Sequence, residues 1–351
     1  MKIASVEVVP YALPFREPYV TARGTLLRRE MVLLRLRDDD GLVGLGEAVP
    51  LSMRGGTGLA QVVEELKALA NQSELDEARL RSGAVRLSPP ARCAALTALL
   101  DLRGRRNAAE GRSTAGAADP IECNASLVAG EPAEVAAEAE RWAADGFRGF
   151  KLKLGVGDDM GQVRTVREAV GDEARIRIDA NAAWEVEVAK RTLAALEPLD
   201  VELAEQPVAT LEEMAEVASE TLIPIAADES VEGRADAERA LALQACALTG
   251  VKLSKVGGPE AAIEIAEVLP VYLTSALDGP VGIAAAAQVA QTLRAAGGEA
   301  VGLAQGLATQ RLFASSVAAV ECELRGPMLH PPEGPGLGVE LDEAALEAHR
   351  L

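Results

Sequence analysis

The sequence predicts an α/β fold in which a (β/α)8-type barrel, a modified TIM barrel, follows an N-terminal α+β capping domain. Two observations lead to this prediction. Three short apolar segments in the first 48 residues precede a helical region, and from residue 121 strand and helix patterns alternate in units of roughly 25 residues. A length of 351 residues suits one barrel of about 250 residues with a smaller partner domain.

The N-terminal domain is expected to span residues 1–118. Apolar patterning predicts three antiparallel strands, with a turn at residues 38–41 and strands at Ile3–Val9, Met31–Arg37 and Leu42–Ala48. Residues 16–29 and 50–58 have the composition of loops. Helical spacing follows over residues 59–112, and a linker is expected at 115–120.

The barrel is expected over residues 119–322. Its strands are predicted to end, with one unit allowed to be incomplete, near Ala125, Lys153, Asp179, Ala204, Ala227, Lys252, Ser275 and Ala304. The helices predicted between them are 131–144, 158–170, 184–196, 211–220, 235–243, 259–268 and 281–296. The tail, residues 323–351, is rich in Pro and Gly, and we expect it to pack back on the first domain.

Composition narrows the function classes. A net charge of −19 argues against nucleic acid and anionic membrane surfaces as partners. No apolar run approaches the roughly 20 residues of a spanning helix, and the first residues alternate like a strand rather than a signal peptide. The four cysteines are scattered, which is typical of reduced, buried thiols. We therefore expect a cytoplasmic protein.

A strand at residues 149–155 carries Lys151 and Lys153 among apolar residues. Residues two apart on a strand share a face, so the two ammonium groups are expected to lie side by side. Their repulsion and the apolar surroundings favour the neutral amine, and the lowered pKa suits a general base. The alternative is a pair of surface lysines on an edge strand.

Three successive barrel strands are predicted to end in a carboxylate, at Asp179, Glu205 and Asp228. Active sites of such barrels lie at the carboxyl ends of the strands, so the three groups should converge. Three oxygen ligands suit Mg²⁺, with Mn²⁺ as an alternative, while the competing interpretation of each carboxylate is a helix N-cap.

The next strand supplies Lys252, and Lys255 competes with it for the same role. Lysines on both sides of three carboxylates fit the abstraction of a proton beside a substrate carboxylate, with the metal and Lys252 sharing the charge that develops. The only histidines, His330 and His349, lie in the tail, so a histidine base, a zinc site and a Ser-His-Asp triad are unsupported.

In these residues and their order the chain resembles the enolase superfamily, muconate-lactonising subgroup, whose lysine base with Mg²⁺ is a known pattern. The resemblance implies that Asp179, Glu205 and Asp228 bind the metal and that Lys153 and Lys252 are the catalytic pair. It also selects Lys252 over Lys255, because a Gly-Gly pair follows at the family's spacing. Lys151, Asn181 and Glu229 take supporting roles in this resemblance.

Three further stretches are similar to the o-succinylbenzoate synthase family: residues 21–30, 274–285 and 306–312. This resemblance implies that substrate contacts come from Arg23, Gly24, Arg177, Ser275 and Gly306. The chain departs from that family at Ala22-Arg23-Gly24, where His-Gly is common, and at Asp278-Gly279, where Glu-Ser or Glu-Thr is common.

The leading hypothesis is therefore syn dehydration of 2-succinyl-6-hydroxy-2,4-cyclohexadiene-1-carboxylate in menaquinone biosynthesis. The alternatives on the same scaffold are an N-succinylamino-acid racemase, a dipeptide epimerase and a muconate cycloisomerase, and a more distant one is a non-catalytic metal-binding member. The expected partner is a small-molecule carboxylate, with self-association into a homo-oligomer left open. The segments 16–29 and 50–58, which contain Gly24, Gly55, Gly56 and Gly58, are predicted to fold over the metal site and shape the substrate pocket.

Overall fold

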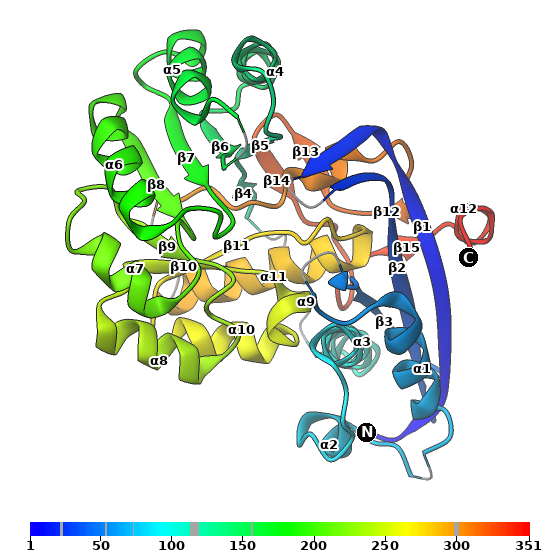
Figure 1. The fold of residues 1–351 in the computed structure, drawn as a ribbon. Coiled ribbons are helices and arrows are strands. Elements are labelled where there is room, and N and C mark those ends of the chain that lie inside the picture. The colour runs from blue at the N-terminus through cyan, green and yellow to red at the C-terminus, as the bar shows by residue number, and fades with distance from the viewer. Residues whose placement is uncertain (22–23, 53–54, 73, 113–118, 156, 298–301) are drawn as a thin grey trace.

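A computed structural model describes residues 1–21, 24–52, 55–72, 74–112, 119–155, 157–297 and 302–351. An N-terminal sheet with its own helices packs beside a curled parallel sheet that is surrounded by helices (Figure 1). The fold is thus the predicted one: α/β, with an N-terminal capping domain. The linker expected at 115–120 lies largely outside the described residues.

The N-terminal sheet has the order β1-β2-β3, with β1 at Ile3–Thr21, β2 at Gly24–Asp38 and β3 at Val43–Ala48. Its helices are α1 Leu59–Leu69, α2 Glu77–Arg81 and α3 Pro89–Ala109. The prediction of a loop at residues 16–29 was wrong, because β1 and β2 continue as an antiparallel ribbon to the pair Thr21–Gly24. The prolines that made this stretch resemble a loop lie at a register shift between Pro14 and Tyr19, where regular strand pairing is interrupted.

The barrel is a seven-stranded parallel sheet in the order β11-β10-β9-β8-β7-β6-β5. Its strands are β5 Ala125–Leu127, β6 Gly149–Lys153, β7 Arg175–Asp179, β8 Val201–Glu205, β9 Ile225–Ala227, β10 Leu248–Val251 and β11 Val271–Leu273. The helices between and after them are α4 Pro132–Ala144, α5 Asp159–Val170, α6 Val186–Leu196, α7 Leu211–Ala218, α8 Arg234–Leu243, α9 Leu253–Val256, α10 Pro259–Ala266 and α11 Pro280–Ala296. Short 3-10 turns lie at Glu197–Leu199 and Ala308–Leu312.

Residues 305 and 306 take the place of the eighth strand. Gln305 bridges Cys123 and Gly306 bridges Thr274, both in parallel sense. Their amides donate to the carbonyls of Glu122 and Leu273, at 2.7 and 2.8 Å. In the described part of this eighth unit, single bridges thus replace a strand. These bridges still join the two edges of the curled sheet, on the β5 side and on the β11 side. This is the incomplete unit that the sequence left room for.

The C-terminal segments connect both parts of the molecule. β4 (Ile121–Glu122), β13 (Glu323–Arg325) and β14 (Met328–His330) form one small sheet, and β12 (Ala318–Val320) pairs with β15 (Glu340–Leu341). After α12 (Glu343–Ala348) the chain runs along β1, where the Leu351 amide donates to the Pro10 carbonyl and the Ala12 amide to the His349 carbonyl, both at 3.0 Å. The last residues of the chain therefore extend the edge of the first sheet.

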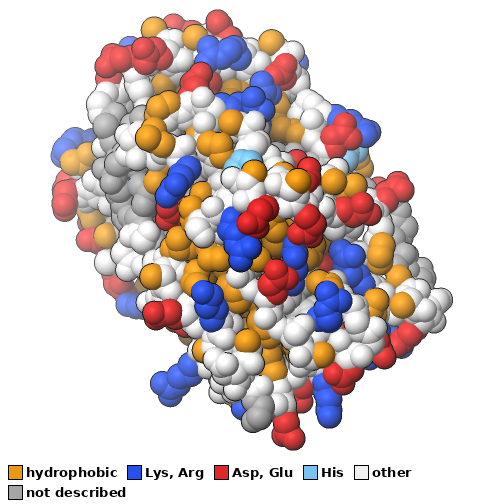
Figure 2. Space-filling model, turned by 90° about the vertical axis from the view of Figure 1, so that its right-hand side faces the viewer, with side chains coloured by type: hydrophobic (Ala, Val, Ile, Leu, Met, Phe, Trp, Pro, Cys, Tyr) orange, Lys and Arg blue, Asp and Glu red, His pale blue; other side chains and the backbone are white. Residues whose placement is uncertain are grey.

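Strand β2 is buried on both faces, which explains why the capping domain and the barrel lie so close together. Val32, Leu34 and Leu36 belong to a core shared with α1 and α3, whereas Met31 and Leu33 belong to the core that continues into the barrel. On the outer face of the molecule seen in Figure 2, acidic and basic side chains are interspersed around apolar ones rather than separated by sign. Among the described residues, no helix combines the length and the apolar character needed to cross a membrane.

Candidate active site

Three carboxylates meet at the carboxyl ends of the central barrel strands. The parallel register places Lys153, Asp179 and Glu205 in one row across β6, β7 and β8, and Asp228 follows directly after β9. All three carboxylates are buried, and one oxygen of each lies within 4.8 Å of the others. The convergence predicted from the strand ends is confirmed.

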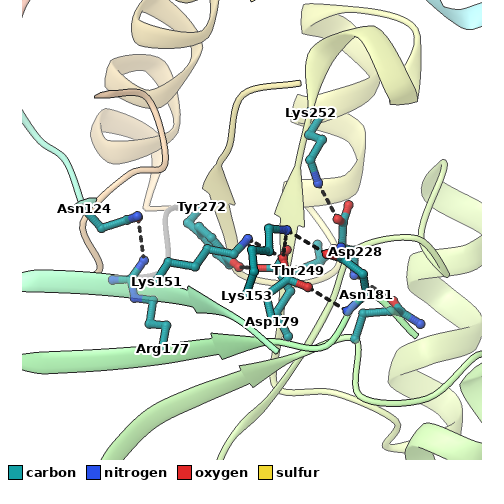
Figure 3. Close-up of polar contacts among 12 residues, drawn as sticks. Asn124, Lys151, Lys153, Arg177, Asp179, Asn181, Asp228, Thr249, Lys252 and Tyr272 are labelled. Atoms are coloured by element: carbon teal, nitrogen blue, oxygen red, sulfur yellow. Dashed lines mark hydrogen bonds and ion pairs between the residues drawn. The ribbon is translucent and has the colours of Figure 1, made fainter. Parts of the chain in front are cut away.

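Lys151 and Lys153 point from β6 toward the same carboxylate (Figure 3), as the strand geometry requires. Lys151 Nζ lies 2.9 Å from Asp179 Oδ2 and 2.6 Å from Glu205 Oε2, and Lys153 Nζ lies 2.5 Å from Asp179 Oδ2. The side chain of Lys151 is only 7% exposed, against 25% for Lys153, so Lys153 is the lysine that a substrate can reach.

The expected lowering of the lysine pKa is wrong for Lys151. Burial acts to lower the pKa of Lys151, but the charges of Asp179 and Glu205 outweigh it and hold this pKa well above its ordinary value. The sequence revealed that Lys153 is a neighbour of Lys151, but not that two carboxylates lie within 2.9 Å of the Lys151 ammonium. The carboxylates thus favour the protonated form of Lys151 inside the site.

Lys252 and Lys255 both contact Asp228 but lie differently. Lys252 is the residue that precedes α9, its Nζ pairs with Asp228 Oδ2, and it lines the cavity described below. Lys255 Nζ lies 3.1 Å from Asp228 Oδ1, donates to the Asp228 carbonyl, and is not among the cavity-lining residues. The structure thus presents Lys252, and not Lys255, to a bound molecule.

The carboxylate trio could hold a divalent cation. Glu205 Oε1 is buried and has no hydrogen-bond partner within the described part of the chain. Burial and the neighbouring Asp179 charge raise the pKa of Glu205, while Lys151 and Lys153 overcome burial and lower the pKa of Asp179. An oxygen without a partner and mutual repulsion in a dry space are what a hard cation would relieve, so the residues present fit a metal of the Mg²⁺ type.

Asn181 and Glu229 connect the lysine side of the site to the end of β9. Asn181 Oδ1 accepts from Lys153 at 2.9 Å, and Asn181 Nδ2 donates to Glu229 Oε1 at 3.1 Å. Asn181 adopts a left-handed conformation, φ 48°, and its amide donates to Asp179 Oδ1. Asn tolerates this conformation better than most residues, which explains its use two residues after a strand-end carboxylate.

A cavity of about 180 Å³ lies over these groups. Its barrel-side lining includes Lys151, Lys153, Lys252, Ser275 and Gly306, and its remaining wall comes from the capping domain through Tyr19, Leu26, Arg29, Pro50 and Leu51. The two N-terminal segments predicted to fold over the site thus do reach it. The hairpin is anchored on the barrel by stacked rings, with Phe15 between Tyr19 (5.5 Å) and Phe313 (5.0 Å).

Three residues expected to contact substrate lie elsewhere or cannot be placed. Arg177 is fully buried inside the barrel and is not among the described residues that line the cavity. Its Nε pairs with Glu202 at 2.5 Å, and its Nη1 donates to the Ala304 carbonyl at 2.6 Å. Arg23 lies outside the described residues. The backbone of Gly24 pairs with Thr21 at the hairpin end.

Sequence reasoning missed two residues that hold the carboxylates in place. Tyr272, fully buried on β11, donates its hydroxyl to Glu205 Oε2, and Gln206 Oε1 accepts from the Asp228 amide at 2.9 Å. The available signals were a tyrosine in an otherwise aliphatic strand and a glutamine directly after a strand-end glutamate. Neither identifies a partner until the strands are placed side by side.

The chain is similar to known proteins in both sequence and fold. Residues 3–110 match the family model "Mandelate racemase / muconate lactonizing enzyme, N-terminal domain", and residues 134–345 match "Enolase C-terminal domain-like". The o-succinylbenzoate synthase of Thermobifida fusca is 36% identical over 206 residues, which cover 57% of this chain and 62% of that protein.

Two solved structures superpose on nearly the whole chain. The muconate lactonizing enzyme from Pseudomonas fluorescens, complexed with muconolactone, has a TM-score of 0.88 at 28% identity and covers 99% of both chains. The dipeptide epimerase from Cytophaga hutchinsonii, complexed with Mg and the dipeptide D-Ala-L-Val, has a TM-score of 0.89 at 27% identity and covers 99% of this chain and 98% of that one. With its capping domain, curled parallel sheet and converging carboxylates, the chain belongs to the enolase superfamily, in the muconate-lactonising subgroup.

Proposed function

We propose that this enzyme removes the proton α to a substrate carboxylate with the help of Mg²⁺, and that its reaction is the o-succinylbenzoate synthase reaction. The observation that carries the proposal is that Lys153 and Lys252 line one cavity directly over three buried carboxylates from successive strands. Asp179, Glu205 and Asp228 would hold the metal, and Mn²⁺ offers the same coordination chemistry.

The dehydration needs a single group that first takes and then returns a proton on one face of the ring. The Lys153 amine accepts the proton from C1 of 2-succinyl-6-hydroxy-2,4-cyclohexadiene-1-carboxylate. The electron pair of that C–H bond becomes the C1–C6 double bond, the C6–O bond breaks, and the Lys153 ammonium returns the proton to the departing hydroxyl, which leaves as water.

Other groups compensate the charge that develops during this reaction. A bound Mg²⁺ would neutralise negative charge on the substrate carboxylate as the proton leaves. Lys252, held beside Asp228, places an ammonium on the other side of the cavity. Asn181 accepts a hydrogen bond from Lys153 and so restricts the position of the Lys153 Nζ.

The choice of dehydration rests on similarity to the Thermobifida fusca enzyme, together with the placement of Ser275 and Gly306 on the cavity wall. The second candidate is a racemase or epimerase, such as an N-succinylamino-acid racemase or a dipeptide epimerase, and it is favoured by one observation. Racemisation requires a proton-transfer group on each face of the substrate, and both Lys153 and Lys252 line the cavity. A muconate cycloisomerase is the third member of this set.

Two assays on the purified protein with Mg²⁺ separate these reactions. Formation of o-succinylbenzoate from the cyclohexadiene substrate is expected, and its absence would contradict the proposed dehydration. Incorporation of solvent deuterium into the α position of N-succinylamino acids or dipeptides, without dehydration activity, would identify a racemase or epimerase instead. A protein inactive in both assays but still able to bind Mg²⁺ leaves the muconate cycloisomerase and the non-catalytic alternative, which an assay with cis,cis-muconate separates.

The cytoplasm is the compartment we propose. All four cysteines, Cys93, Cys123, Cys246 and Cys322, are free and buried, which suits a reducing environment. We propose a small-molecule carboxylate as the binding partner, and size-exclusion chromatography with light scattering would establish whether the chain also forms a homo-oligomer.

A further inference from the structure

We propose that Arg29 binds a second anionic group of the substrate, at the end of the cavity formed by the capping domain. The inference rests on the proposed function in one respect only, namely that a first carboxylate of the substrate lies near the barrel carboxylates. It assigns Arg29 as a residue that selects substrates by their second anionic group.

The position of Arg29 is set by the sheet. It lies on β2 opposite Leu13 of β1, and its Nη2 donates to the Pro50 carbonyl at 2.8 Å. That bond joins the hairpin to the segment after β3, and both segments contribute to the cavity wall. Arg29 is thus a guanidinium held in a fixed direction at the cavity, not a freely moving surface side chain.

The charges around the cavity favour an anion at this end. The basic lining residues are Arg29, Lys151, Lys153 and Lys252, and Glu229 is the one acidic residue among the described lining residues. The three lysines contact Asp179 or Asp228 in the barrel. Among the described lining residues, Arg29 is the positively charged one that comes from the capping domain.

Asp278 is a buried carboxylate within electrostatic reach of Arg29. Its Oδ2 accepts from the Ser275 hydroxyl and from the Ala276 amide, each at 2.7 Å. Asp278 therefore has neutral hydrogen-bond donors of its own. A guanidinium is well suited to a carboxylate, because its planar array of N–H groups matches the two oxygens and its charge is not lost at any working pH.

The consequence is a rule for substrate choice. A succinyl chain ends in a carboxylate and gains an attractive partner at Arg29. A dipeptide places its ammonium at the end distant from its α-carboxylate, and two positive charges in a water-poor cavity repel each other. Arg29 thus favours succinyl compounds over dipeptides independently of the proton-transfer step.

Binding measurements test this rule without requiring turnover. Isothermal titration in the presence of Mg²⁺ compares o-succinylbenzoate with 2-butanoylbenzoate, in which a methyl group replaces the distal carboxylate. The wild-type protein is expected to bind o-succinylbenzoate at least about tenfold more tightly, and Arg29→Gln is expected to reduce this ratio to within about threefold of unity. Arg29→Lys, which keeps the charge but loses the planar fork, should retain part of the ratio.

The matched control is Arg28→Gln. Arg28 is the preceding residue on the same strand, its side chain is 57% exposed, and it pairs with Glu30. The Arg28 variant should keep the wild-type ratio. A merely structural role of Arg29 would weaken binding of both ligands equally and leave the ratio unchanged.

The outcomes distinguish the two proposals. Equal binding of the two ligands by the wild type, or an unchanged ratio in Arg29→Gln, would overturn the assignment of Arg29 even if the dehydration assay succeeds. A ratio that behaves as expected in a protein without dehydration activity would support the Arg29 site and overturn the proposed reaction. Failure of the wild type to bind either ligand would overturn both.

Discussion

Lys153 differs from its neighbour Lys151 in exposure rather than in type, and this difference sets the first prediction. Lys153→Ala removes the amine that we propose as the proton-transfer group, so kcat should fall by about 10²–10⁴ while KM changes little. Steady-state kinetics and solvent-deuterium exchange would measure the loss. Lys67→Ala, which alters an exposed lysine on α1, is the control and should behave as the wild type. A Lys153→Ala variant that still exchanges the α-proton would assign the base elsewhere.

Glu47 is a buried carboxylate between the two parts of the molecule. Its Oε2 accepts from the Tyr11 hydroxyl and its Oε1 from the Gly279 amide, each at 2.7 Å, at the N-terminus of α11. Burial and the nearby charge of Asp278 raise the pKa of Glu47 from 4.5 to about 7. The folded protein therefore keeps a proton that the unfolded chain releases at lower pH.

The second prediction follows from that raised pKa. Glu47 makes its full contribution to the free energy of unfolding below pH 4.5, where the carboxyl is protonated in both states. This contribution is lost as the pH rises toward about 7. Glu47→Gln cannot titrate, so its free energy of unfolding should change less than that of the wild type between about pH 4.5 and about pH 7. Urea unfolding at both pH values measures this, with Glu64→Gln, an exposed glutamate of α1, as control. An identical pH dependence in wild type and Glu47→Gln would contradict the prediction.

Residues at strand ends were predictable from the sequence, but residues that act across the molecule were not. Asp179, Glu205 and Asp228 could be found because each follows its own strand pattern. Tyr272 contacts a carboxylate 67 residues away, and Arg29 lines a cavity together with residues of the barrel. A single sequence carries no information about such pairs. Resemblance has a limit as well. The resemblance to the o-succinylbenzoate synthase family implied that Arg177 contacts substrate, yet its side chain is fully buried inside the barrel.

At the scale of elements, β3 and α3 pack unusually closely. A Cβ atom built on Gly46 would lie 1.9 Å from the Ala94 carbonyl oxygen, and one on Gly44 would lie 2.1 Å from that of Ala98. These obstructing atoms belong to the helix backbone, which cannot move aside as a flexible side chain can. The two glycines therefore determine how near the helix lies to the sheet.

The third prediction tests this close approach. Gly46→Ala should lower the free energy of unfolding by about 1–3 kcal/mol, because the strand or the helix must shift to admit one methyl group. Chemical denaturation measures the change. Gly130→Ala is the control, since its Cβ would meet Val135 Cγ2 at an ordinary 3.5 Å. Equal stability of the two variants would show that the strand and helix separate without cost.

The hairpin of β1 and β2 shows why element boundaries were harder to predict than element types. Prolines and charged residues in 14–18 weaken the alternation on which a strand prediction depends. In the structure these residues occupy the register shift of a two-stranded ribbon, where a missing amide donor is tolerated. The ribbon is held by stacking of Phe15 on Phe313, a contact 298 residues apart that the sequence pattern cannot show.

At the scale of the whole molecule, the fourth prediction concerns removal of the metal. All three carboxylates pair with lysines: Asp179 and Glu205 share Lys151, and Asp228 pairs with Lys252. Their charges are therefore compensated within the protein, and chelation should abolish activity while leaving the fold intact. Far-UV circular dichroism and the dehydration assay, before and after EDTA and after addition of Mg²⁺, would test this. Loss of the dichroism signal on chelation would instead indicate a structural metal.

The architecture as a whole was the most predictable level, because each strand–helix unit repeats the same hydrophobic pattern. Closure of the barrel was less predictable. Gln305 and Gly306 replace a strand with single bridges, and bridges leave no periodicity in the sequence. The course of the last residues along β1 depends on backbone hydrogen bonds, which any side chain at those positions could make.

The hairpin over the cavity also has an evolutionary consequence. Its two strands continue from the sheet through ordinary antiparallel pairs, such as Ala12 with Glu30, and the lysines among the described lining residues all come from the barrel. Substitutions in the hairpin can therefore change which substrates the cavity accepts and leave the lysines and carboxylates of the barrel unchanged. A lineage built in this way can acquire a new substrate through changes in one short ribbon, and a laboratory library confined to residues 14–29 would explore the same freedom.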